Sequence, residues 1–214
     1  MSNNNIEAVR RINADLVKAD GSLKTFQEQL LEYKYGKYPK GVPLVVSETS
    51  KVLNLPTGVL DDLPITINQA IISKIEKKHG IEVDTIIELN KKICSSVLGV
   101  ESLTLKNGMV LILNEKNAND DYIVCALHKN VKSVHVEVNA IRSLYGKEKL
   151  FNLIKTAIKE TKDIYTTNKT DDWIKSIGVY FPKEISNHLS LIKHTKEIEK
   201  CQGKPKVKNN MKAR

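Results

Sequence analysis

The alternation of apolar and polar positions is clearest in residues 134–145, V-H-V-E-V-N-A-I-R-S-L-Y. Valines and polar residues alternate at the start of this stretch: Val134, His135, Val136, Glu137, Val138 and Asn139. A period of two places successive side chains on opposite faces of a β-strand. The pattern therefore predicts a strand that packs its valines on one face and leaves its three polar side chains on the other.

Helical spacing of apolar residues predicts α-helices on both sides of this strand. In residues 148–161, for example, Phe151, Ile154 and Ile158 fall on one face, and most lysines fall on the opposite face. The same kind of spacing predicts helices at residues 6–19, 23–35, 68–79, 84–95, 170–177 and 186–200. We expect the first two helices either to pack on the main body or to form a partly independent arm.

Two further stretches read as central strands. Residues 109–113 and 122–127 are apolar throughout, which indicates strands covered on both faces. Asn107 and Gly108 precede the first of them, and Asn-Gly favours a tight hairpin turn to a strand at 103–105. Shorter strands are predicted at residues 42–47 and 164–167.

This order of elements predicts an α+β fold, with N-terminal helices followed by a mainly antiparallel sheet of about four to five strands packed by helices. The expected division is a helical arm at 1–36, an α+β domain at 37–200 and a disordered basic tail at 201–214. Gly, Pro and Asn in the tail argue against regular structure there.

Charge is concentrated in that tail. The net charge is +9, and the tail contributes five cations and no acid: Lys204, Lys206, Lys208, Lys212 and Arg214. Removing the tail therefore leaves 9 − 5 = +4. Such a segment either binds nucleic-acid phosphates without reading sequence or only keeps the protein soluble.

Composition excludes several classes of protein. No apolar run approaches the roughly 20 residues that a membrane span needs, and the N-terminus lacks the pattern of a secretory leader. The three cysteines are far apart and have no zinc-ligand spacing, and Cys125 lies in an apolar stretch typical of a buried thiol. We expect no membrane association, no structural metal and no disulfide framework.

The candidate catalytic and binding residues lie within 135–143, in and around the alternating strand. An imidazole, a carboxylate, an amide, a guanidinium and a hydroxyl occur within nine residues: His135, Glu137, Asn139, Arg142 and Ser143. Together these groups can move a proton and hold a phosphate. The ordinary alternative is a half-solvated strand whose polar face simply meets water.

A second histidine, His79, follows Ile71 and Ile75 at intervals of four and precedes Gly80. It is therefore expected at the C-terminal end of a helix, where the helix dipole favours an imidazolium that can donate a proton. Alternatively, the imidazole only bonds the free carbonyls of the last turn.

Five motifs along the chain resemble one known family. They are P-K-G at 39–41, L-P-I at 63–65, the helix ending at His79, V-N-A-I-R-S-L-Y-G-K at 138–147, and I-Y-x-x-N-K at 164–169. In this order they are similar to the C-terminal domain of phage Mu F-type head proteins and to modules of large polyvalent phage proteins. The resemblance covers residues 26–174, and the block at 134–147 is its most specific part.

The resemblance implies a phage or mobile-element protein of the barnase, EndoU, colicin and RelE-like group, whose members act as ribonucleases or toxins. The positions that match the family are His79, Asn139, Arg142, Ser143, Tyr145 and Lys169. The implied activity is cleavage of RNA phosphodiesters without a metal ion or other cofactor, in the host cytoplasm or after transport in the phage particle.

Cleavage of this kind needs a base for the ribose 2′-hydroxyl, an acid for the leaving oxygen and cations on the phosphate. Glu137 or neutral His135 is the predicted base, and His79 or the other histidine is the predicted acid. Arg142 and Lys169 are expected to hold the phosphate. The substrate would be positioned by Asn139, Ser143 and Tyr145.

The alternative function is a catalytically inactive binding module. Such a module would inhibit a host defence protein or assist head assembly or DNA packaging, using the basic tail and the N-terminal helices. An immunity partner for a basic nuclease is a third class, but it predicts an acidic surface, which a net charge of +9 opposes.

Overall fold

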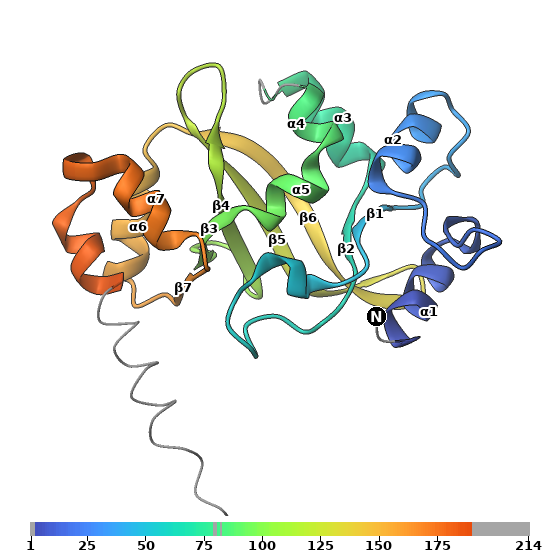
Figure 1. Cartoon of the computed structure of the whole chain (residues 1–214), viewed down its shortest axis with the longest axis horizontal. Coiled ribbons are helices and arrows are strands. Elements are labelled where there is room, and N and C mark those ends of the chain that lie inside the picture. Colours follow the sequence, from blue (N-terminus) through green and yellow to red (C-terminus); the bar gives the residue numbers. More distant parts are fainter. Residues whose placement is uncertain (1–2, 79–80, 82, 190–214) are drawn as a thin grey trace, which may run out of the picture.

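The computed structural model describes residues 3–78, 81 and 83–189 (Figure 1). His79 and the basic tail lie outside these residues, so the roles predicted for them stay predictions. Within the described part, seven strands form one mixed sheet with helices packed on it.

The sheet has the strand order β1-β2-β6-β5-β4-β3-β7. The strands are β1 (Leu44–Ser47), β2 (Ile65–Ile67), β3 (Ser96–Glu101), β4 (Gly108–Lys116), β5 (Tyr122–Ser133), β6 (Val136–Lys147) and β7 (Ile164–Thr166). Strands β3 to β6 form an antiparallel meander, β7 pairs with β3, and β2 joins β6 in parallel. The sheet is therefore larger than the four to five strands predicted. It is mixed because β2 runs parallel to β6, whereas the other neighbouring strands are antiparallel.

The helices group on the sheet in two sets. They are α1 (Asn3–Ile12), α2 (Phe26–Lys34), α3 (Gln69–Lys78), α4 (Val83–Ile87), α5 (Leu89–Cys94), α6 (Leu150–Lys159) and α7 (Thr170–Ile177), and residues 183–189 are also helical. Figure 1 shows α6 and α7 at the β3–β7 end, while α1 to α5 lie over the centre and the β1 end. Short 3-10 turns add η1 (Ala14–Leu16), η2 (Ser50–Leu53) and η3 (Gly178–Tyr180).

Two apolar cores result, one on each side of the central strands. Along β4, Leu111 packs in the core shared with α1 to α5, whereas Val110 and Ile112 pack in the core shared with α6 and α7. The prediction that residues 109–113 are covered on both faces is confirmed. Trp173 of α7 is 1% exposed at the centre of the second core.

The N-terminal helices belong to the main body. Val9 of α1 and Leu30 of α2 are buried in the first core with sheet residues. Helix α2 begins with a capping box, in which Thr25 Oγ1 accepts from Glu28 N and Glu28 Oε2 accepts from Thr25 N. One turn later, the buried Gln29 amide bonds both Val45 N and Val45 O, at 2.8 and 3.0 Å. This amide supplies the partner that edge strand β1 lacks.

Four local predictions are wrong in their boundaries. The helix expected at 6–19 ends at Ile12 and is followed by η1. Residues 103–105 form bends, because the strand that pairs with β4 is Ser96–Glu101. Val134 and His135 form the turn between β5 and β6, so the strand begins at Val136. The helix predicted at 84–95 is divided into α4 and α5.

Candidate functional site

The polar residues predicted to form one cluster are spread along β6. His135 lies in the turn before the strand, Glu137 lies opposite Lys132 near its start, and Arg142 lies beyond its middle. At about 3.3 Å per residue, the six steps from Val136 to Arg142 span roughly 20 Å. His135 and Arg142 therefore cannot act on one phosphate group.

Asn139 lies between these residues, but it is buried. Its side chain is on the face shared with Ile65, its parallel partner on β2, and the residue is 0% exposed. Its amide nitrogen donates to Ser50 Oγ at 2.7 Å and to Asp61 O at 3.2 Å, and its carbonyl oxygen accepts from Asn130 N at 3.1 Å. This geometry places Asn139 as an anchor of the 50–64 loop rather than as a group open to substrate.

The loop anchored by Asn139 forms one wall of a cleft of about 590 Å³. Its lining includes Ser50, Lys51, Asn54, Asp61, Asp62 and Asn168. Asp62 is held by a hydrogen bond from Thr49 Oγ1 and by an ion pair with Lys51 at 2.7 Å. Burial of this carboxyl acts to raise its pKa, but the contacts with Lys51 and Thr49 together outweigh that effect and lower the pKa of Asp62. Asp62 is therefore a carboxylate at neutral pH and is not set up as a proton donor.

Lys169 follows Asn168 at the N-terminus of α7, next to strand β7. Strand β7 is four places from β6 in the sheet. Neighbouring strands are about 4.8 Å apart, which separates the two strands by roughly 19 Å. The structure therefore does not bring Lys169 beside the backbone of Arg142.

A different set of polar side chains does share one surface. Ser143 pairs with Ala126 across β5 and β6, and His128 lies two residues beyond Ala126 on the same face of β5. Diagonal neighbours on a sheet face lie roughly 7–8 Å apart. We call Ala126, His128, Arg142 and Ser143 the β5–β6 strip.

Arg142 joins the strip because of an irregularity in β6. Ala126 pairs with Ser143 while the next residue, Leu127, pairs with Ile141, so Arg142 is the extra residue of a β-bulge. Bulges redirect side chains and are common beside active sites. Arg142 is exposed, and its guanidinium has no hydrogen bond or ion pair with any residue in the described part of the chain.

The strip is the part of its face that the helices leave uncovered. Farther along, Val124 and Ile112 are buried under α6 and α7. In the strip itself, Ala126, His128 and Ser143 are half-buried. The side chains of His128 and Ser143 have no hydrogen-bonding partner among the described residues. An imidazole, a hydroxyl and a guanidinium therefore meet solvent together.

Tyr145 extends this surface two residues beyond Ser143. It pairs with Val124 and packs partly against the second core. Burial raises the pKa of its phenol, so the phenol keeps its proton at neutral pH.

His128 was missed by the sequence analysis, although a signal was present. Val124, Ala126 and His128 continue a period of two at the end of an apolar run. We assigned residues 122–127 to a strand covered on both faces. That assignment overlooked that one face of the strand becomes accessible to solvent from Ala126 onward. Only the bulge and the limit of α6 show that His128 and Ser143 share an exposed surface.

The described residues contain no group of three or more His, Cys, Asp or Glu side chains that could hold a metal ion. No helix in the described ranges is long and apolar enough to cross a membrane.

One comparison with known proteins found a match. Residues 70–172, just under half of the chain, match the family model of the phage MuF C-terminal domain. No curated protein and no solved structure matches the chain. The matched segment contains α3 to α6 and the whole β5–β6 strip, whereas the 50–64 loop lies before it. The resemblance to Mu F-type proteins is confirmed for these residues, and the nuclease grouping stays a prediction.

Proposed function

We propose, from the match of residues 70–172 to the phage MuF C-terminal domain, that this chain is a phage protein that binds RNA on the β5–β6 strip and cleaves it without a metal ion. The observation that supports this proposal is the position of His128, Arg142 and Ser143. These three residues lie on neighbouring positions of two paired strands, and none of their side chains is used by the described part of the fold.

The proposed reaction begins with the ribose 2′-hydroxyl. Neutral His128 takes its proton while the oxygen attacks the adjacent phosphorus, which forms a 2′,3′-cyclic phosphate. The bond from phosphorus to the 5′-oxygen breaks, and that oxygen takes a proton from Tyr145. Arg142 pairs two phosphate oxygens at once, and Ser143 donates a hydrogen bond to one of them.

This assignment changes the roles proposed from the sequence. His128 replaces His135 and Glu137 as the base, because the latter two lie near the hairpin turn, far from Arg142. Asn139 supports the neighbouring loop, and Lys169 contributes charge from the N-terminus of α7. His79 remains a predicted proton donor outside the described residues and is the alternative to Tyr145.

The test is degradation of labelled single-stranded RNA by the full chain with a metal chelator present. We expect His128→Ala, which removes the general base, and Arg142→Ala, which removes the phosphate clamp, each to lower the rate at least about 100-fold. His135→Ala, in the turn between β5 and β6, and Glu137→Ala, in β6, are matched controls and should keep the wild-type rate. A wild-type rate for H128A with a loss in H135A would overturn the assignment of the base.

The second candidate function is the inactive binding module, and it is favoured by the wide separation of the residues predicted from the sequence. If wild-type protein leaves RNA intact under all conditions, the chain would instead act through contacts with a host defence protein or with components of head assembly. Because α1 and α2 are packed into the main core, their exposed faces, not a free arm, would make those contacts.

A further inference from the structure

The C-terminal end of α2, the turn to β1 and the outer side of α3 form one exposed surface. Tyr33 Oη lies 2.8 Å from Ser73 Oγ, a hydrogen bond that joins the end of α2 to α3. Lys77 lies one helical turn beyond Ser73 and is exposed on the same side of α3. We call this region the α2–α3 surface, and its exposed side chains include Leu31, Tyr35, Lys37, Lys40, Lys74 and Lys77.

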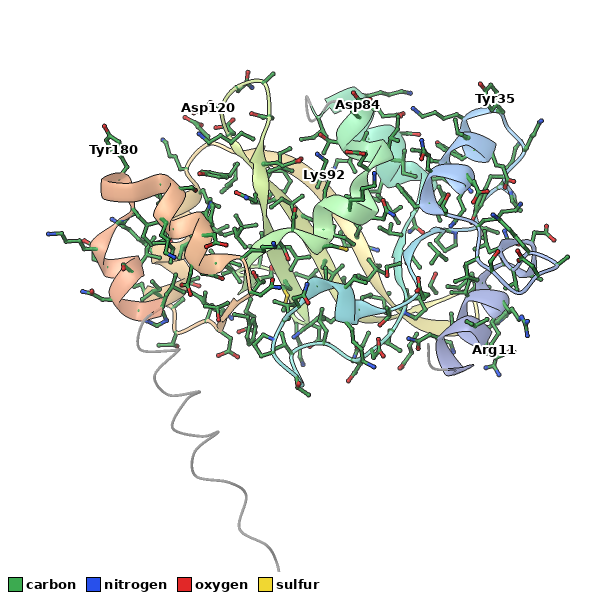
Figure 2. The ribbon with its side chains drawn as sticks, viewed as in Figure 1. Arg11, Tyr35, Asp84, Lys92, Asp120 and Tyr180 are labelled. Atoms are coloured by element: carbon green, nitrogen blue, oxygen red, sulfur yellow. The ribbon has the colours of Figure 1, made fainter. Side chains whose placement is uncertain are left out.

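Two large apolar side chains of this surface meet solvent together. Leu31 is 48% exposed and Tyr35 is 76% exposed. Tyr35 N donates to Leu31 O at 3.0 Å, so the two residues are one helical turn apart and their side chains are neighbours. Figure 2 shows Tyr35 at the outer end of α2. The fold gains little from burying either side chain, and exposed tyrosines are among the residues that contribute most at protein interfaces.

The charge around this apolar pair is positive and uncompensated. Residues 31–42 and 69–77 contain two acids, and each already has a partner: Glu32 pairs with Lys24 at 2.7 Å, and Glu76 pairs with Lys34 at 3.1 Å. Figure 2 shows the exposed Asp84 of α4 apart from Tyr35. Four lysines of the surface have no ion pair with any residue in the described part of the chain: Lys37, Lys40, Lys74 and Lys77.

The turn that carries two of these lysines is held in one conformation. The amide nitrogen of Gln69, the first residue of α3, donates to Pro39 O at 2.7 Å and to Val42 O at 2.8 Å. Tyr38, which is 4% exposed, donates from its hydroxyl to Pro43 O at 3.0 Å. Because these bonds fix the turn before a partner arrives, binding there costs little conformational entropy of the backbone.

We propose that the α2–α3 surface binds an acidic segment of another protein. Apolar side chains of that segment would pack on Leu31 and Tyr35, and its carboxylates would lie beside the four lysines. The uncompensated positive charge selects an acidic partner, and the aliphatic Leu31 beside Tyr35 selects a polypeptide. A single-stranded nucleic acid is held instead by several aromatic rings on which successive bases stack, and Tyr35 is the one largely exposed ring among the described residues of this surface.

This surface is separate from the β5–β6 strip. Ile72 and Ile75 of α3 are buried in the first core with Cys125, whereas Ala126 of the strip faces the other side of β5. The partner and an RNA strand would therefore occupy different faces of the sheet. The inference goes beyond the proposed cleavage and does not depend on it.

The test titrates the full chain with a fluorescent amphipathic peptide of about 20 residues, built from Glu, Leu and Ala, which forms a helix of roughly 30 Å. Fluorescence anisotropy gives the affinity, and amide NMR shifts of the labelled protein give the site. We expect the shifts to change at residues 31–42 and 69–77. Tyr35→Ala, at an exposed position, should weaken binding at least about five-fold. The double variant K37E/K40E should weaken it further, because like charges then face each other.

The double variant K106E/K159E is the matched control. Lys106 and Lys159 are exposed and lie outside the α2–α3 surface, so this variant changes the net charge equally and should bind the peptide as wild type does. A peptide of the same composition whose leucines do not share one helical face should bind more weakly. The proposal is overturned if the amphipathic peptide does not bind, if Y35A binds as tightly as wild type, or if K106E/K159E weakens binding as much as K37E/K40E. Stronger shifts of the same residues by an oligouridylate than by the peptide would also overturn it, in favour of a nucleic-acid site.

Discussion

The amide nitrogen of Asn139 donates a hydrogen bond to Ser50 Oγ at 2.7 Å, between residues 89 positions apart in the chain. Ser50 Oγ in turn donates to Leu63 O at 2.7 Å, so β6 is joined to both ends of the 50–64 loop. This buried connection holds the wall of the cleft in place. Asn139 therefore has a structural role, although the sequence analysis predicted that it positions the substrate.

Replacing Asn139 by alanine should destabilise the protein by about 3 kcal/mol. The change removes the buried hydrogen bond to Ser50 Oγ and the part-buried ones to Asp61 O and from Asn130 N, and it empties a fully buried site. Urea unfolding followed by circular dichroism measures the effect. Asn152→Ala, at an exposed position of α6, is the control and should change stability by less than about 0.5 kcal/mol. Equal stability of the two variants would contradict the anchoring role.

Val134→Gly should stabilise the protein by about 1 kcal/mol. Glycine adopts the positive φ at this turn without a clash of Cβ, although its larger freedom in the unfolded chain offsets part of the gain. Val136→Gly, two residues away in β6, should destabilise instead, because that side chain is half-buried and packs on the first core. Thermal unfolding of both variants checks the opposite signs.

Glu28 should titrate near pH 2. The side-chain hydrogen bond from Lys18, followed by those from Thr25, lowers its pKa from about 4.5 to about 2. Since the folded pKa is below the unfolded one, the stabilisation is fully present above pH 4.5 and is lost as the pH falls towards 2. The carboxyl carbon shift in an NMR titration measures the midpoint. Lys18→Ala should raise that midpoint, and an unchanged value would exclude the pairing in solution.

Cys125 should resist alkylation in the folded protein. It is completely buried between strands, and burial raises the pKa of its thiol to about 12, so almost no thiolate exists at pH 8. Peptide mapping after treatment with iodoacetamide should find Cys125 modified only after denaturant is added. The half-buried Cys94, whose thiol pKa is raised by a smaller degree of burial, should react first of the two. Rapid native labelling of Cys125 would show that the central sheet opens.

The spacing of apolar residues was sufficient to predict the helices and strands that bury one regular face or both faces. The helix at 150–159 and the two-sided burial of residues 109–113 follow from apolar spacing, because each position records whether its own side chain meets the core. The family resemblance likewise depends only on short motifs and their order along the chain, so the sequence alone was sufficient to recognise it.

The sequence by itself thus determined the α+β class, most helices and the alternation of side chains from Val136 to Asn139. Tertiary structure decided which alternating face solvent can reach. Strand β2 and the 50–64 loop bury Asn139, whereas His128 and Ser143 lie beyond the cover of α6 and are only half-buried. The physical reason is that periodicity fixes only the relative direction of neighbouring side chains. What covers each direction depends on segments far along the chain, and a one-residue bulge at Arg142 changes the direction itself.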